Sequence, residues 1–149
     1  MSSEHGFPFE RELREQHDAL RASVRWLAAE VDRGAELDLV ALLDMFAGEL
    51  VGHFRFEERH GLAEALGCPA LEVRRWSAEL VRQHGEMEQR LDELQRCVDA
   101  LRAAGSARAF PRSELAALLT AIRRHDAEEN ALLHWLARHP WPRARRPED

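Results

Sequence analysis

The sequence contains no tyrosine and only two cysteines, and both shortages limit its chemistry. Without tyrosine, neither a tyrosyl radical nor a phenolate metal ligand is available. Cys68 and Cys97 give no disulfide framework, and we expect both to be free, buried thiols in a reducing cytosol rather than a disulfide.

Long apolar runs are also missing. No stretch of about 18 apolar residues is present, so no membrane-spanning helix is expected. The first nine residues lack the apolar core of a signal peptide, which favours a cytoplasmic location. A net charge of -6 argues against nucleic acid as a partner. With 45% hydrophobic and 32% charged residues, the 149-residue chain is expected to form one globular domain over residues 1–149.

No alternating strand pattern occurs, and apolar residues recur instead at helical spacing in four stretches. The second and third stretches carry these stripes: Leu39, Leu42, Phe46, Leu50, His53, Glu57 and His60, then Leu80, His84, Met87, Leu91, Leu94, Val98 and Leu101. Gly34, Gly67 with Pro69, and the segment 105–112 separate the stretches. Four amphipathic helices with short connections predict an all-α, up-down-up-down antiparallel four-helix bundle. Its core spans about residues 9–138, between a short N-terminal arm and an Arg-rich tail.

The second stretch contains His53-Phe54-Arg55-Phe56-Glu57-Glu58, which sets an imidazole and a carboxylate one helical turn apart. Polar groups inside an apolar stripe need partners, and a metal ion satisfies both. Four of the eight histidines have Glu four residues later, so one pair alone is weak support. Support increases because His125 and Glu129 repeat the pair, and because His17 and His84 each lie at the centre of an apolar helix.

Ligands on different helices of a bundle must lie at one height. His53 lies 13 residues before Leu66, His84 lies 13 after Leu71, and His125 lies 13 before Arg138. At about 1.5 Å per residue, each is roughly 20 Å from the same end of the bundle. His17 falls at the same height when counted from the other end.

The remaining histidines do not meet this condition. His60 and His134 lie nearer the end of the bundle. We interpret His60 with Glu64 as a surface or outer pair. His5, His134 and His139 are interpreted as ordinary polar positions.

The candidate ligands occur in two similar halves of the chain. Each half has a helix with one His, followed by a helix with His-x-x-x-Glu. Leu13-x-x-Gln16-His17 also resembles Leu80-x-x-Gln83-His84. Two such halves would give each of two metal ions a pair of imidazoles, with the carboxylates as bridges and water or oxide completing the shell. Imidazole and carboxylate without thiolate suit iron or manganese better than structural zinc. The alternative is a metal-free bundle whose core histidines are only hydrogen-bonded.

These motifs resemble the hemerythrin-like family, the His-His-Glu cation-binding domains, across about residues 9–138. The resemblance implies a non-haem di-iron centre, oxo- or hydroxo-bridged, inside a four-helix bundle. The implied ligands are His17, His53, Glu57, His84, His125 and Glu129.

The chain departs from the oxygen-carrying hemerythrins at two positions. Glu88 stands where they have a second third-helix His, and it is kept as an additional candidate ligand. Asn130 stands where they have an Asp, and the acid is Glu129 instead. A four-His, two-Glu set is similar to bacterial members linked to iron-sulfur repair and nitric oxide stress.

Three classes of function follow. A binding or sensing protein for oxygen or nitric oxide, protective against oxidative or nitrosative stress, is placed first. A di-iron redox enzyme acting on peroxide, or in iron-sulfur cluster repair, is the alternative. A metal-free helical interaction module is third. The expected partner is a small diatomic or peroxide ligand, and the sequence does not indicate an oligomeric state.

Overall fold

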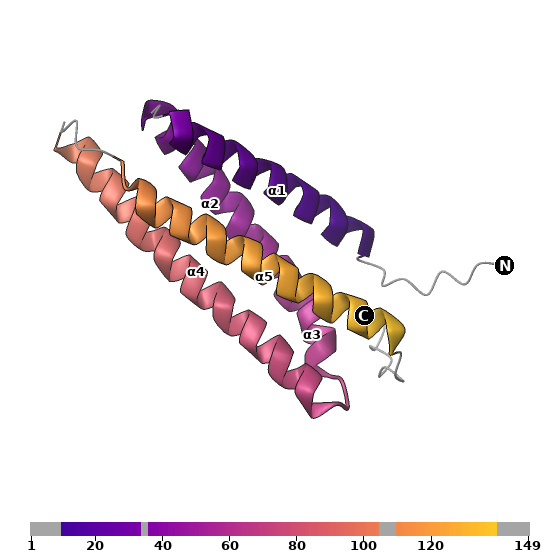
Figure 1. Ribbon diagram of the computed structural model, residues 1–149. Helices are drawn as coiled ribbons and strands as arrows, with labels where there is room; N and C mark the ends of the chain where they lie inside the picture. The colour runs from indigo at the N-terminus through magenta and orange to yellow at the C-terminus, as the bar shows by residue number, and fades with distance from the viewer. Residues whose placement is uncertain (1–9, 34–35, 105–109, 140–149) are drawn as a thin grey trace, which may run out of the picture.

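The computed structural model describes residues 10–33, 36–104 and 110–139, and within them every regular element is a helix. The helices are α1 (Glu10–Arg33), α2 (Glu36–Arg59), α3 (Gly61–Leu66), α4 (Leu71–Ala103) and α5 (Arg112–Arg138). Four are long and α3 is short (Figure 1).

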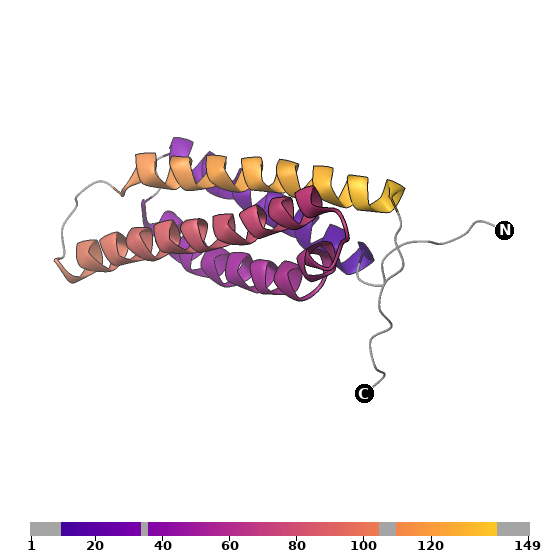
Figure 2. The same cartoon turned by 90° about the horizontal axis from the view of Figure 1, so that it is seen from below.

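The four long helices form a bundle in which α1 and α4 each pack against both α2 and α5. Consecutive long helices run in opposite directions (Figures 1 and 2). The start of α1, the end of α5 and the short α3 lie at the same end. The predicted all-α, up-down-up-down antiparallel bundle is confirmed.

The second predicted helix is interrupted at His60, which has φ −115° and ψ −97°. Its backbone N–H bonds to the carbonyl oxygens of both Phe56 (3.1 Å) and Glu57 (3.3 Å) before α3 continues the chain. The prediction of one uninterrupted helix to Leu66 was therefore wrong. Apolar spacing continues across the bend, and Gly61, a weak helix former, is the only local sign of it.

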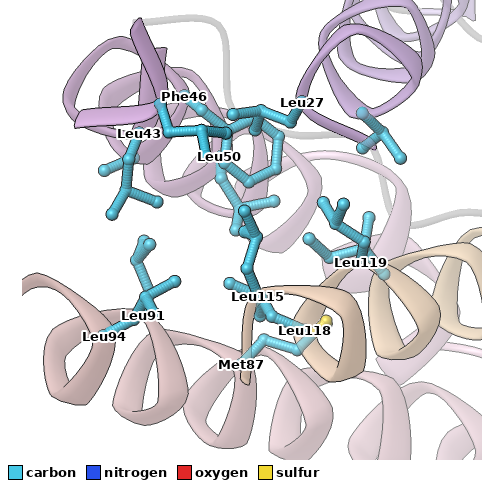
Figure 3. Packing of buried hydrophobic residues seen from close by; sticks show 14 of the residues in the cluster. Leu27, Leu43, Phe46, Leu50, Met87, Leu91, Leu94, Leu115, Leu118 and Leu119 are labelled. Carbon is cyan, nitrogen blue, oxygen red and sulfur yellow. The ribbon is translucent and has the colours of Figure 1, made fainter. Parts of the chain in front are cut away.

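The larger apolar cluster, here the main core, fills the end of the bundle away from α3. Its side chains come from all four long helices and point towards one another (Figure 3). They include Leu27, Leu43, Phe46, Leu50, Met87, Leu91, Leu94, Leu115, Leu118 and Leu119. Leu43 is fully buried, whereas the predicted stripe residue Leu42 is only partly buried against this cluster.

A smaller apolar cluster, here the end core, lies beside α3. It consists of Leu62, Ala65, Cys68, Val73, Leu80, Leu132 and Leu136. Ser77, fully buried on α4, donates a hydrogen bond to the Leu62 carbonyl oxygen (2.9 Å) and so joins α4 to α3. On α5, the predicted ligands lie between Ile122 of the main core and Leu132 of the end core. A polar layer therefore separates two apolar regions.

Both cysteines are free, as predicted, but only Cys68 is buried. Cys97 is exposed, so its predicted burial was wrong: it lies one position before the buried Val98, on the outer side of α4. Within the described residues, no helix combines the length and apolar character needed to cross a bilayer. The predicted N-terminal arm, most of the loop before α5 and the Arg-rich tail lie outside the described residues.

Candidate metal centre

Six side chains from four helices meet in the polar layer, and none is more than 6% exposed. They are His17 from α1, His53 and Glu57 from α2, His84 from α4, and His125 and Glu129 from α5. Their ligand atoms fall into two groups that share Glu57, each compact enough for one metal ion. The expectation that these positions lie at one height is confirmed.

The Glu57 carboxylate lies between two pairs of histidines. Its Oε1 contacts His53 Nε2 and lies 3.0 Å from His17 Nε2. Its Oε2 lies 3.0 Å from His84 Nε2 and 3.7 Å from His125 Nε2. The two oxygens thus face different imidazole pairs.

Glu129 occupies a similar position on α5. Its Oε1 lies 3.3 Å from His17 Nε2, and its Oε2 lies 3.5 Å from His125 Nε2. Together with Glu57, this carboxylate joins the two imidazole pairs.

The outward-facing nitrogens of three histidines are hydrogen-bonded. His53 Nδ1 donates to Gln16 Oε1 (3.1 Å), and His125 Nδ1 donates to Gln83 Oε1 (2.9 Å). His84 Nδ1 donates to Glu58 Oε1 (2.9 Å). Because these oxygens only accept, Nδ1 holds the hydrogen and Nε2 can ligate a cation. Such outer partners fix the tautomer and orientation of a metal-binding imidazole.

The two glutamines show how the halves of the chain are related. Each directly precedes a His of its own helix and bonds to the His of the neighbouring helix. Each also donates to an acid four residues earlier: Gln16 to Glu12 (3.3 Å) and Gln83 to Glu79 (3.4 Å). The doubled sequence pattern therefore corresponds to a doubled hydrogen-bond pattern.

The carboxylates hold protons on two histidines of the metal-free protein, His17 and His125. Burial lowers the pKa of His17, but hydrogen bonds and charge from Glu129 and Glu57 outweigh it and raise the pKa from 6.5 to about 10. Burial also lowers the pKa of His125, but the neighbouring carboxylates of Glu129 and Glu57 raise it to about 9. Burial raises the pKa of Glu57, but the four surrounding imidazoles lower it well below 4.5. A cation that binds here must displace protons from the imidazoles.

The cluster has donor atoms that the protein does not satisfy. Among the described residues, Glu57 Oε2 and Glu129 Oε2 are buried and accept no hydrogen bond. His84 Nε2 and His125 Nε2 face each other at 3.0 Å. Buried oxygens without partners are costly, and paired nitrogens at this distance need a hydrogen or a cation between them. The donor set therefore fits a metal.

The other predicted positions lie outside both groups. Glu88 Oε2 accepts a hydrogen bond from Arg55 Nη2 (2.9 Å), and its side chain is 26% exposed. His60, at the bend, packs its ring 4.4 Å from that of Phe56. His134 and His139 are exposed, and His5 lies outside the described residues.

Sequence reasoning missed Asp126, which directly follows a ligand. Its Oδ1 lies 3.7 Å from His17 Nε2, and its Oδ2 accepts a hydrogen bond from Arg21 Nε (2.9 Å). In the other half, the corresponding residue is Phe54, whose ring stacks on His84 at 4.1 Å. Position after the ligand His was the only sequence signal for this pair of residues.

Comparison with known proteins gives one family. The family model described as Hemerythrin HHE cation binding domain matches residues 9–137. No curated protein and no solved structure matches the chain.

Proposed function

The chain belongs to the family of hemerythrin HHE cation-binding domains, and from this premise we propose that its buried cluster holds two non-haem iron ions that bind a small ligand such as oxygen or nitric oxide. One ion would be held by His17 and His53, the other by His84 and His125. Glu57 and Glu129 would serve both. The buried His and Glu donors support a metal-binding protein independently of the family.

The position of Glu57 is the observation that carries the two-ion proposal. Each of its oxygens faces a separate pair of imidazoles. The oxygens lie 3.0 to 3.7 Å from the Nε2 atoms of His17, His84 and His125. A single ion near one pair would leave the other pair and one carboxylate oxygen buried without a partner. Two ions satisfy both sets.

The donor types favour iron. Imidazole and carboxylate ligands suit iron or manganese, and neither cysteine belongs to the cluster. Bound iron would supply reversible redox chemistry and a coordination position for a small ligand. The protein would supply orientation through Gln16, Gln83 and Glu58, and the two apolar clusters would shield the site from water.

Metal content tests this proposal. We expect two iron ions per chain after anaerobic reconstitution with ferrous iron, measured by elemental analysis. Glu57→Ala should reduce iron at both positions because both imidazole pairs face this residue, whereas His60→Ala, a matched histidine control, should retain both ions. One ion or fewer in the unmodified protein would overturn the two-ion proposal.

The visible spectrum separates binding from turnover. A reversible spectral change on repeated addition and removal of oxygen supports a binding protein. Steady consumption of added hydrogen peroxide by the loaded protein, without loss of iron, would favour the redox enzyme instead. His134→Ala, which changes an exposed histidine, provides the control for surface effects.

A further inference from the structure

We propose that small monovalent anions reach the metal centre through the hollow between α1 and α5, and that Asp126 gates their access to the His17–His53 half. This inference rests on the proposed function, because the anion would bind at the loaded centre. It concerns residues outside the six ligands and names the class of external ligand.

The hollow between α1 and α5, here the α1–α5 hollow, has a volume of about 240 Å³ and touches the centre at one candidate ligand. His17 and Asp126 both line it. The nitrogen of His17 nearest Asp126 is Nε2, the same atom that faces Glu57 and Glu129. Because Asp126 lines the hollow and lies beside this nitrogen, we expect a ligand in the hollow to approach the metal-facing side of the imidazole.

A second hollow, between α4 and α5, is similar in size, about 270 Å³, and is lined by His125 and Gln83. The Nδ1 of this histidine is bonded to Gln83, so the hollow meets the outer edge of the ring. Phe54 stacks on His84 in the same half and covers it. The α4–α5 hollow therefore meets His125 on the side away from its metal-facing Nε2.

Charge distinguishes the two hollows. The α1–α5 hollow is lined by three arginines and one carboxylate, whereas the α4–α5 hollow has three arginines and three glutamates. Arg21 is paired with Asp126, while Arg25 and Arg123 show no ion pair with any described residue. In a protein of net charge -6, the α1–α5 hollow is therefore a local cationic region that attracts small anions.

Asp126 is placed to control the final approach of an anion to the metal-facing side of His17. Its side chain is 20% exposed, lies 3.7 Å from His17 Nε2 and is held from outside by Arg21. While it remains there, its negative charge opposes an incoming anion and its oxygen occupies the approach. Movement of the carboxylate towards Arg21 would clear the position without breaking any covalent bond.

Azide is a suitable probe because it is a small monoanion with a visible absorption band on ferric iron. The iron-loaded, oxidised full chain should be titrated with azide beside Asp126→Ala and Asp126→Asn. Removing the carboxylate should tighten azide binding about tenfold, a coupling of about 1.4 kcal/mol. The Asn variant should tighten binding too, because it removes the charge and keeps the shape.

The arginines are tested by association rate. Arg25→Ala with Arg123→Ala should slow azide association about three- to tenfold at low ionic strength and have little effect at high salt. The matched control, Arg82→Ala with Arg124→Ala in the α4–α5 hollow, should leave the rate unchanged.

Iron content, measured on every variant, keeps the two proposals distinguishable. If the unmodified protein holds no iron, the proposed function fails and this inference with it. If all variants hold iron but neither Asp126 variant changes azide affinity, the inference alone fails. A slower rate in the Arg82 and Arg124 control, with none in the Arg25 and Arg123 variant, would place access between α4 and α5 and also overturn it.

Discussion

Raising the pH should destabilise the metal-free protein, because its centre stores protons that the unfolded chain releases. The pKa of His17 is raised to about 10 and that of His125 to about 9 by the carboxylates of Glu129 and Glu57, which outweigh burial. In the unfolded chain both imidazoles lose their protons near pH 6.5. Their stabilising contribution is therefore complete below about pH 6.5 and is lost as the pH rises through 9 and 10.

The size of the effect follows from proton linkage. Each extra proton held by the folded state lowers the free energy of unfolding by about 1.4 kcal/mol per pH unit as the pH rises. With two such imidazoles, the loss between pH 7 and 8.5 is about 3.5 kcal/mol. That is a large share of the roughly 5 to 15 kcal/mol that holds a domain folded.

Urea unfolding followed by helical circular dichroism measures this loss on chelator-treated protein. His17→Gln should reduce the pH dependence by about half, because one of the two raised pKa values is removed. His134→Gln, an exposed control, should not change it. In the iron-loaded protein the ligating imidazoles are neutral, so the dependence should largely disappear. A metal-free stability that stays constant or rises from pH 7 to 8.5 would refute the assignment of protons to these histidines.

Four further substitutions test the packing and the outer hydrogen bonds. Gln16→Ala and Gln83→Ala should each weaken iron binding about 10- to 100-fold in a chelator competition, because each substitution releases a histidine of the neighbouring helix. Unchanged iron affinity in both variants would show that the glutamines do not orient the ligands. Ser77→Ala should lower the free energy of unfolding by about 1 kcal/mol in urea, because the Leu62 carbonyl loses its donor; a neutral result would mean that water replaces the hydroxyl. Phe54→Ala should cost about 3 to 5 kcal/mol in the same assay, with or without iron, and a loss confined to the iron-loaded protein would contradict a packing role.

The fold was largely predictable because helical spacing depends on local chemistry alone. The seam on α4 from Leu80 to Val98 is buried at every predicted position. The break at His60 was not predictable, because apolar spacing continues through it and the packing of α3 against α4 is not visible in the sequence. Leu43 rather than Leu42 is buried in the core for a related reason. Apolar spacing predicts which face of a helix is buried only to within about one residue position.

The positions of the six candidate ligands were predictable from their equal heights, but their surroundings were not. Gln16 and Gln83 were visible as a repeat, yet their partners lie on neighbouring helices, 37 and 42 residues away. Asp126 meets His17 across the bundle, and only the rotation of α5 against α1 brings them together. Contacts of this kind depend on helix orientation, which residue spacing does not determine.

The polar layer between the main core and the end core also fixes the alignment of the helices. An apolar seam that repeats every three or four residues matches itself again after a shift of one turn, so hydrophobic burial alone discriminates weakly between neighbouring alignments. Sliding α4 by one turn would move His84 about 5.4 Å along the bundle axis. Glu57 Oε2 would then lose the nearer of its two facing imidazoles while remaining buried. The same six side chains that would hold the metal therefore penalise every slipped arrangement of the bundle.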